Sequence, residues 1–387
     1  MIIKKAYKFR LKPSHHQVLL MQKFAGHCRF AWNKVLGLNL ERLEKKLPLI
    51  WYFEADFWTR LWKKSDEYGF LKEAPAQCIQ QKLRDLEKAF RDAFDKNQPD
   101  KKLPKYRKKS LHNSFRFPQP SQIKIDNRRI ELPKLGWIKF HKSQPISGTV
   151  KNVTISRSGC HWFVSIQVEQ EIAETSTISK PAIGIDLGIT KFAAFSDNTY
   201  LVGPDAFAKH QKKLAKEQRK LSKKVKFSNN WRKQKSKITK LHTRIANVRN
   251  DFLHKSSTII SKNHAMVVVE DLKIKNMSKS AKGTLENPGK RVKAKSGLNK
   301  SILDQGWGEF RRQLEYKTQW RGGVFVKVPP MNTSLTCRVC NYKDKLNRQK
   351  QDQFECIECG HKENADIHAA KNILAAGHAV LACGEEH

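Results

Sequence analysis

The sequence predicts a multi-domain α/β protein, and three observations point to this fold class. The chain has 387 residues, and at about 150 residues per domain this length suggests two or three cores. Hydrophobic residues make up 39% and aromatic residues 9% of the chain, which excludes a wholly disordered basic protein. Strand-like and helical periodicities occupy separate blocks, and in the second half they alternate as expected for an α/β core with a mixed sheet.

The first part of the chain is predicted to form one strand followed by helices. Residues 4–11 alternate loosely between apolar and polar side chains, which predicts a strand. Ser14 and Gln17 have the spacing of a capping box at the start of the next helix. Residues 51–62, and the run that ends at about Phe94, have helical spacing. The aromatic side chains of residues 51–62 are expected to pack in a helical core, and the alternative is that they stack on bases.

After about residue 94 the composition and the apolar pattern of the chain change, which predicts a linker followed by a β-rich segment. Residues 97–110 are polar, basic and interrupted by proline, which is typical of a linker. From Phe115 to about Val168, short apolar runs are broken by Pro, Gly and Asn, which is typical of β-strands. We expect this segment to form a small barrel with the N-terminal strand.

The second half alternates strands and helices in a recognisable order. The first predicted elements are strands over 182–186, 191–197 and 199–203, two long helices within 205–263 and a strand over 265–270. They are followed by a mobile loop over 273–300, a helix over about 299–320, a strand over 323–328 and a final helix over 364–381. The helix over 299–320 is predicted to carry Leu303, Trp307, Phe310 and Leu314 on one face. This is the element order of a ribonuclease H-like domain with two insertions.

The charge of the chain is strongly one-sided. It has 76 Lys and Arg residues against 36 Asp and Glu, a net charge of +40. Surplus charge of one sign repels itself, so it indicates a partner of opposite sign, and nucleic acid is favoured over an anionic membrane or an acidic protein. Residues 101–109, 209–240 and 273–300 carry dense cations that suit phosphate contacts. The sequence contains no GxxxxGK[ST] loop, so it gives no support to an ATP-driven motor.

Apolar patterning argues against secretion and membrane insertion. The N-terminal residues contain no apolar run long enough for a signal peptide. The most continuous apolar stretch, around residues 265–269, is far shorter than the roughly 20 residues of a membrane helix. We therefore expect a cytoplasmic protein that does not bind membranes.

Four of the eight cysteines form two CxxC pairs with the spacing of a zinc ribbon. Cys337 and Cys340 are separated by fifteen residues from Cys356 and Cys359. Zinc takes four tetrahedral ligands, and each CxxC turn supplies two thiolates. The alternative is a pair of disulfides or free thiols. Because four protein ligands leave no open position, a Zn²⁺ ion here would be structural rather than catalytic.

Three acidic residues lie in unusually apolar surroundings. Asp186 and Glu270 end predicted buried strands, and Asp366 opens the last predicted helix. If the three converge on one edge of the sheet, their carboxylates could hold two Mg²⁺ ions for phosphodiester hydrolysis. Each acid also has a simpler explanation. Asp186 could belong to a turn, Asp366 could be a helix N-terminal acid, and Asp271 could act in place of Glu270.

These pieces together resemble the TnpB (OrfB) family of transposon-encoded RNA-guided nucleases, which are related to the type V CRISPR effectors. The resemblance covers nearly the whole chain and is carried by YKFRLKPS…RFAWNKVL, GIDLGITKFAAFSD, VVVEDLKIKNM and CIECGHKENADIHAAKNIL. Two positions depart from the family pattern. Asn341 stands in the first knuckle where Gly is common, and Asn also tolerates a left-handed turn. His368 stands where Asn is usual, which could alter metal affinity or rate.

The resemblance implies the domains, the site and the partners. The implied domains are a wedge-like β-barrel over 1–12 and 110–178, a helical recognition domain over 13–109, a RuvC-type nuclease over 179–330 and 361–387, and a zinc-ribbon insert over 331–360. Asp186, Glu270 and Asp366 are the implied catalytic acids and Mg²⁺ ligands.

The implied activity is cleavage of double-stranded target DNA beside a short adjacent motif. The implied guide is an RNA derived from the transposon end. The protein is expected to be a monomer that binds one RNA, and to be associated with the nucleoid of a prokaryote. A guided DNA-binding repressor that does not cleave, and a DNA transposase, remain the alternatives.

Overall fold

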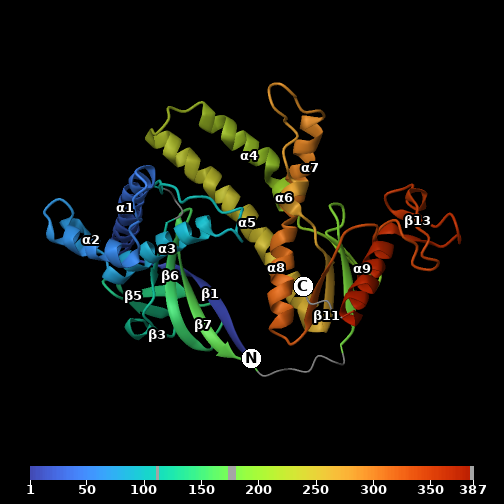
Figure 1. Ribbon diagram of the computed structural model, residues 1–387, viewed down its shortest axis with the longest axis horizontal. Helices are drawn as coiled ribbons and strands as arrows, with labels where there is room; N and C mark the ends of the chain where they lie inside the picture. The colour runs from blue at the N-terminus through green and yellow to red at the C-terminus, as the bar shows by residue number, and fades with distance from the viewer. Residues whose placement is uncertain (110–112, 173–179, 384–387) are drawn as a thin grey trace. The chain divides into compact units, whose positions relative to one another are not determined.

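The computed structural model describes residues 1–109, 113–172 and 180–383. The chain divides into two compact units, Met1–Ile172 and Ala173–His387 (Figure 1). The expected domain boundaries at residues 110, 178–179 and 387 lie outside the described residues. Within the described part of the chain, no helix has both the length and the apolar character that crossing a membrane requires.

The first unit combines a seven-stranded antiparallel sheet with helices. Its strands are β1 (Ile2–Lys12), β2 (Ser114–Phe117), β3 (Lys124–Asp126), β4 (Arg129–Leu132), β5 (Gly136–His141), β6 (Thr149–Ser158) and β7 (His161–Glu171), and its helices are α1 (His15–Glu44), α2 (Tyr52–Lys64) and α3 (Ala76–Phe94). The sheet order is β2-β6-β7-β1-β5-β4-β3. The N-terminal strand therefore lies between β7 and β5, which confirms its predicted pairing with the β-rich segment.

The predicted capping box at the start of α1 is confirmed. Ser14 Oγ accepts a hydrogen bond from Gln17 N at 3.2 Å, and Ser14 N donates to Gln17 Oε1 at 3.0 Å. Gln17 Nε2 also donates to the carbonyl oxygens of Leu135 and Trp137, both at 3.0 Å. The cap therefore satisfies the first turn of the helix and also joins α1 to the start of β5.

The expectation that the aromatic residues of 51–62 pack in a core is wrong for most of them. Tyr52 and Trp62 do pack against the core of the first unit. The exposed members are Trp51 (37%), Phe53 (83%), Phe57 (52%) and Trp58 (38%). The reason is that α2 buries only a narrow stripe, formed by the small side chains of Ala55 and Thr59.

The second unit contains a five-stranded mixed sheet covered by helices. Its elements are β8 (Ala182–Leu187), β9 (Ala193–Phe195), β10 (Tyr200–Leu201), α4 (Ala206–Ser222), α5 (Asn229–Asn263), β11 (Met266–Glu270), α6 (Ile274–Met277), α7 (Val292–Gln305), α8 (Trp307–Gln319), β12 (Val324–Val328), β13 (Gln353–Glu355), β14 (Lys362–Asn364) and α9 (Ala365–Ala382). The sheet order is β10-β9-β8-β11-β12. β8, β11 and β12 are parallel, whereas β9 and β10 are antiparallel. The predicted mixed sheet is therefore confirmed.

Both faces of this sheet are buried, which explains the apolar run at β11. Val267 and Val269 pack on one face with side chains of α5 and α8. Met266 and Val268 pack on the other face, where α9 contributes Ile373. A strand that is covered on both faces has no polar alternation, so the run MVVV is what this position in the sheet requires.

Two expectations for residues 273–320 are wrong. Residues 292–300 belong to α7 and not to a loop, because the helix is held by polar contacts that hydrophobic periodicity does not reveal. Lys295 Nζ donates to Met277 O at 2.6 Å. The predicted helix over 299–320 is two helices, divided at Gly306, which has a left-handed φ of 74°. A Cβ there would lie 3.1 Å from Arg249 Cδ. Because of this break Leu303 is 54% exposed, while the other predicted face residues are buried.

Candidate active site and nucleic-acid interface

The sheet of the second unit places two of the predicted acids side by side. Parallel pairing of β8 with β11 puts Ile185 opposite Val269. Asp186 and Glu270 are the next residues on the two strands, so they lie next to each other at the carboxyl ends of neighbouring strands. Both carboxylates are partly buried, in contrast to an ordinary exposed acid.

Helix α9 brings the third acid to the same place. It packs so closely on β8 that a Cβ at Gly184 would lie 2.2 Å from the carbonyl oxygen of Ala370. Asp366 lies one helical turn before Ala370, in the first turn of α9. The Asn364 side chain caps this helix, because its Oδ1 accepts from the backbone nitrogen of Asp366 at 3.1 Å. Glycine in β8 and the cap of α9 thus set the position of the carboxylate.

The charges of both other acids act on Asp186. Burial, and then the charges of Glu270 and Asp366, raise the pKa of Asp186 to about 7. Burial also raises the pKa of Glu270. Carboxylates that repel one another in a partly buried site call for a cation. All of the donors are oxygens, the ligands that Mg²⁺ prefers, so this residue set fits a divalent cation.

Two residues that the sequence analysis did not identify also contact the acids. Thr333 Oγ1 donates to Glu270 Oε1 at 2.6 Å. Arg348 Nη2 donates to Asp366 Oδ1 at 3.2 Å, and its charge partly opposes the rise in the pKa of Asp186. No signal singled out Arg348 among the many cations of the chain. Thr333 lies four residues before the first CxxC pair, and only its proximity to that motif could have drawn attention to it.

The four cysteines of the CxxC pairs converge as predicted. Their sulfur atoms all lie within 4.8 Å of one another, and the Sγ atoms of Cys337 and Cys359, like those of Cys340 and Cys356, are 3.6 Å apart. A tetrahedral ion with metal–sulfur bonds of about 2.3 Å needs sulfur atoms about 3.8 Å apart. The eight cysteines all lie in the described part of the chain, and none of them is in a disulfide. The expected tolerance of Asn341 for a left-handed turn is confirmed, since its φ is 61°.

Glu363 and His368 link this cysteine knuckle to α9. Although burial opposes it, hydrogen bonds from Lys371 and Arg338 lower the pKa of Glu363 to about 2. His368 is fully buried, and its Nε2 lies 2.9 Å from the carbonyl oxygen of Thr336. The histidine that departs from the family pattern therefore contacts the base of the knuckle. Residues 363–368 therefore connect the cysteine cluster to the start of the helix that carries Asp366.

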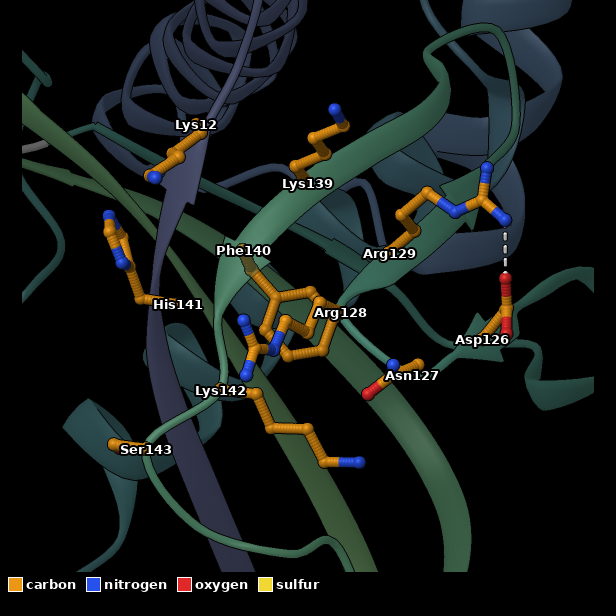
Figure 2. Close-up of a pocket in the computed structure, with 10 residues that line it drawn as sticks. All are labelled: Lys12, Asp126, Asn127, Arg128, Arg129, Lys139, Phe140, His141, Lys142 and Ser143. Carbon is orange, nitrogen blue, oxygen red and sulfur yellow. Dashed lines mark hydrogen bonds and ion pairs between the residues drawn. The ribbon is translucent and has the colours of Figure 1, made fainter.

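The first unit contains a cationic pocket of about 700 Å³ (Figure 2). Its walls come from the end of β1, from β5 and the residues after it, and from the turn between β3 and β4. The lining residues are Lys12, Asp126, Asn127, Arg128, Arg129, Lys139, Phe140, His141, Lys142 and Ser143. The single lining acid, Asp126, is bonded to Arg129 at 2.5 Å, as the dashed line in Figure 2 marks.

The sheet register places like charges directly opposite one another in this pocket. Lys139 lies opposite Lys12 on one side and opposite Arg129 on the other. Partial desolvation and the charges of Lys12 and Arg10 lower the pKa of His141. Like charges in direct cross-strand register destabilise a sheet. The arrangement is therefore typical of a surface that binds a polyanion.

Comparison with known proteins gives a consistent result along the chain. Residues 165–281 match the OrfB family model, described as a probable transposase, residues 307–373 match a Cas12f1-like TNB domain, and residues 1–47 match a helix-turn-helix domain. In the structure the last of these segments contains β1 and the single uninterrupted helix α1.

Among the relatives that match over nearly the full length of the chain, two are more than 30% identical to it. A protein of Escherichia coli K12 named "Putative RNA-guided DNA endonuclease InsQ" is 50% identical, covering 98% of this chain and 94% of that protein. A Streptomyces pristinaespiralis protein named "Putative RNA-guided DNA endonuclease" is 31% identical, covering 99% and 92%. The cryo-EM structure of a Cas12f1–sgRNA–target DNA complex matches with a TM-score of 0.54 and 13% identity, covering 96% of this chain and 98% of that one. At this identity, the likeness concerns the fold alone.

Proposed function

The chain belongs to the OrfB (TnpB) family, and from this premise we propose that it is a transposon-encoded, RNA-guided DNA endonuclease. The observation that carries the proposal is the convergence of Asp186, Glu270 and Asp366 at one end of a mixed sheet, where the pKa of Asp186 is raised to about 7. A protein that only bound nucleic acid would have no need for a buried carboxylate whose pKa two further acids raise, because this arrangement costs free energy unless a cation is present.

In the proposed reaction Asp186, Glu270 and Asp366 would hold Mg²⁺. The metal would supply activation of a water and stabilisation of the leaving oxygen for phosphodiester hydrolysis. Thr333 holds the Glu270 carboxylate through its hydrogen bond. Arg348 places a positive charge beside Asp366, where it would also attract the phosphate of an entering strand.

The domain assignments follow the family pattern. We assign the five-stranded sheet and its helices to a RuvC-type, ribonuclease H-like nuclease, formed by residues 179–330 and 361–387. Residues 331–360 are assigned to a zinc ribbon, with Zn²⁺ held by the four clustered cysteines. The seven-stranded sheet is assigned to the wedge-like barrel, and α1 to α3 are assigned to the recognition domain. A guide RNA would carry sequence specificity by pairing with the target, while the protein contacts the backbone.

The experiment that tests this function is cleavage of a plasmid library with a randomised flank beside a guide-matched target. The chain is co-expressed with the DNA that flanks its gene, so that the native RNA is present. We expect cuts only with a matching guide and with Mg²⁺, next to one short flanking motif. Binding of the matched target without cutting would favour the guided repressor. Cutting or joining at transposon ends without a guide would favour the transposase.

Removing charge from the cationic pocket is expected to weaken RNA binding in a salt-dependent way. Lys12→Ala combined with Lys139→Ala removes two cations that lie opposite each other in the lining of the pocket. Each lost phosphate contact should reduce the slope of log affinity against log salt by about 0.7–0.9, which a filter-binding series from 50 to 200 mM salt would measure.

The matched control removes two lysines of the same sheet that lie outside the pocket and share one carboxylate partner. Lys4 and Lys151 both lie near the Glu169 carboxylate, at 3.9 and 2.7 Å. Lys4→Ala combined with Lys151→Ala should leave the slope unchanged. Equal effects of the two double variants would show that the pocket has no special role in binding.

A further inference from the structure

The helical hairpin formed by α4 and α5 carries a dense positive charge that the acidic site does not use. Residues 209–240 contain fourteen Lys or Arg residues and one acid, Glu217. That acid is already engaged, because it accepts from Gln234 Nε2 at 2.6 Å and from Lys220 Nζ at 3.2 Å. The two helices run side by side, and their closed end points away from the sheet of their own unit (Figure 1). The hairpin thus presents an almost uncompensated row of cations.

The closed end of the hairpin displays apolar side chains within this charge. Residues 225–228 form a turn in which Ser228 N donates to Val225 O at 3.2 Å. Val225 is 79% exposed and Phe227 is 63% exposed. Neither side chain contributes to the small core between the two helices, which is formed by residues such as Leu214 and Ile245. Packing inside the hairpin therefore does not explain why a phenylalanine occupies this turn.

Phe227 is also held in an unfavourable backbone conformation. Its φ is 70°, in the left-handed region, at the turn position that glycine or asparagine usually occupies. For a bulky aromatic residue this conformation is an outlier that costs free energy. The next residue, Ser228, caps α5 by accepting from Trp231 N at 3.2 Å, so the helix start fixes the turn. Strain of this kind persists mainly where a side chain has a function.

The surroundings of the ring are those of a stacking platform. The Phe227 ring lies 5.4 Å from the Trp231 ring, measured between centroids. Lys226 lies over the Phe227 ring at 5.5 Å, and Lys235 lies over the Trp231 ring at 4.8 Å. An exposed ring, supported by a second ring and flanked by ammonium groups, is the combination with which proteins bind single-stranded nucleic acid.

We infer that this turn is a base-stacking site, in which an unpaired nucleobase lies on Phe227 while the cations of α4 and α5 hold the flanking phosphates. Unpaired bases are what exposed aromatic side chains bind in RNA. An unpaired base of the guide RNA and one of a DNA strand offer the same chemistry. The inference rests on the proposed function, since it supposes that the chain binds RNA and DNA.

The test is Phe227→Gly, which removes the ring and relieves the strain. Binding of a labelled transcript of the flanking DNA is measured first with RNA alone and then in the complex with target DNA. Loss of one stacked base should weaken binding roughly 5- to 150-fold, equally at low and high salt because no charge is removed. The melting temperature should stay the same or rise, because glycine adopts a left-handed φ without strain. Phe227→Tyr keeps a ring and should bind like the wild type.

Val225→Ala is the matched control in the same turn, and it should change affinity less than two-fold. A loss with RNA alone would assign the base to the guide, and a loss only after DNA is added would assign it to a DNA strand. Unchanged affinity of Phe227→Gly in both arms, or a lowered melting temperature, would overturn the inference. Failure of the wild type to bind the transcript would instead count against the proposed function and, with it, the stacking site.

Discussion

Asp186→Asn is expected to abolish guided cleavage while leaving RNA binding intact. The negative charges of Glu270 and Asp366 both act on Asp186 and raise its pKa. Loss of its negative charge removes a shared cation ligand, so the cleavage rate should fall by about 10³-fold or more. Single-turnover cleavage of a guide-matched plasmid measures the rate, and filter binding measures RNA affinity. The asparagine keeps the shape of the side chain, so folding is not put at risk.

The same substitution should stabilise the protein when magnesium is absent. The pKa of Asp186 is about 7 in the folded state, above its value of about 3.9 in an unfolded chain. The folded state therefore binds this proton more tightly. The contribution of this carboxyl group to stability is fully present below about pH 4 and is lost as the pH rises through 7. At pH 8 the substitution should recover up to about 4 kcal/mol, given 1.36 kcal/mol per pKa unit.

Thermal melting of the zinc-loaded protein in magnesium-free buffer at pH 5 and at pH 8 measures this effect. We expect Asp186→Asn to raise the melting temperature more at pH 8 than at pH 5. Asp251→Asn is the control, because Asp251 lies on the exposed face of α5, paired with Lys255, and it should change neither melting nor cleavage. A lower melting temperature for Asp186→Asn at pH 8 would show that the acids do not repel one another in the folded protein.

The sheet that carries these acids could be predicted from the sequence because its signals are local. Strands covered on both faces are continuously apolar, as at residues 266–269, and an acid at the end of such a strand is conspicuous. The cysteine cluster was predictable for the same reason, since its spacing is part of the sequence. The role of Gly184 could not be predicted from the sequence, because it depends on the close approach of α9.

The features that the sequence did not reveal depend on contacts between distant residues. Arg348 reaches Asp366 across a fold of the chain, and nothing local distinguishes it from the other cations. The exposure of α2 aromatics such as Phe53 depends on how few neighbours that helix has, which its composition does not record. The break at Gly306 interrupts a hydrophobic pattern that continues on both sides of it. Each error arose where tertiary context decided the result.

Removal of zinc from the cysteine cluster is expected to stop cleavage although no cysteine contacts the acids. Structural zinc contributes about 10–16 kcal/mol of binding free energy in small zinc domains, so without it the knuckle should unfold. Thr333 and Arg348 lie on either side of the first CxxC pair and bond to Glu270 and Asp366. Unfolding of the knuckle would therefore release both contacts, and the acids would lose their alignment.

Cys356→Ser is the variant that tests this coupling. We expect it to lose the bound zinc, measured by elemental analysis, to become protease-sensitive between residues 331 and 364, and to cleave at least 10²-fold more slowly than the wild type. Cys160→Ser should keep zinc and activity, since Cys160 is an exposed thiol in the other unit. RNA binding through the cationic pocket should survive in both variants, because that pocket belongs to the first unit.

The two parts of the prediction can fail separately, which makes the measurement informative. Zinc loss with normal cleavage would mean that the acids are aligned by β8, β11 and α9 alone, and that the bonds from Thr333 and Arg348 are incidental. Full zinc retention in Cys356→Ser would mean that the three remaining thiolates hold the ion with another donor. Loss of cleavage that re-addition of zinc to chelated wild-type protein restores, with magnesium present throughout, would establish that the ribbon acts on catalysis by positioning the acids.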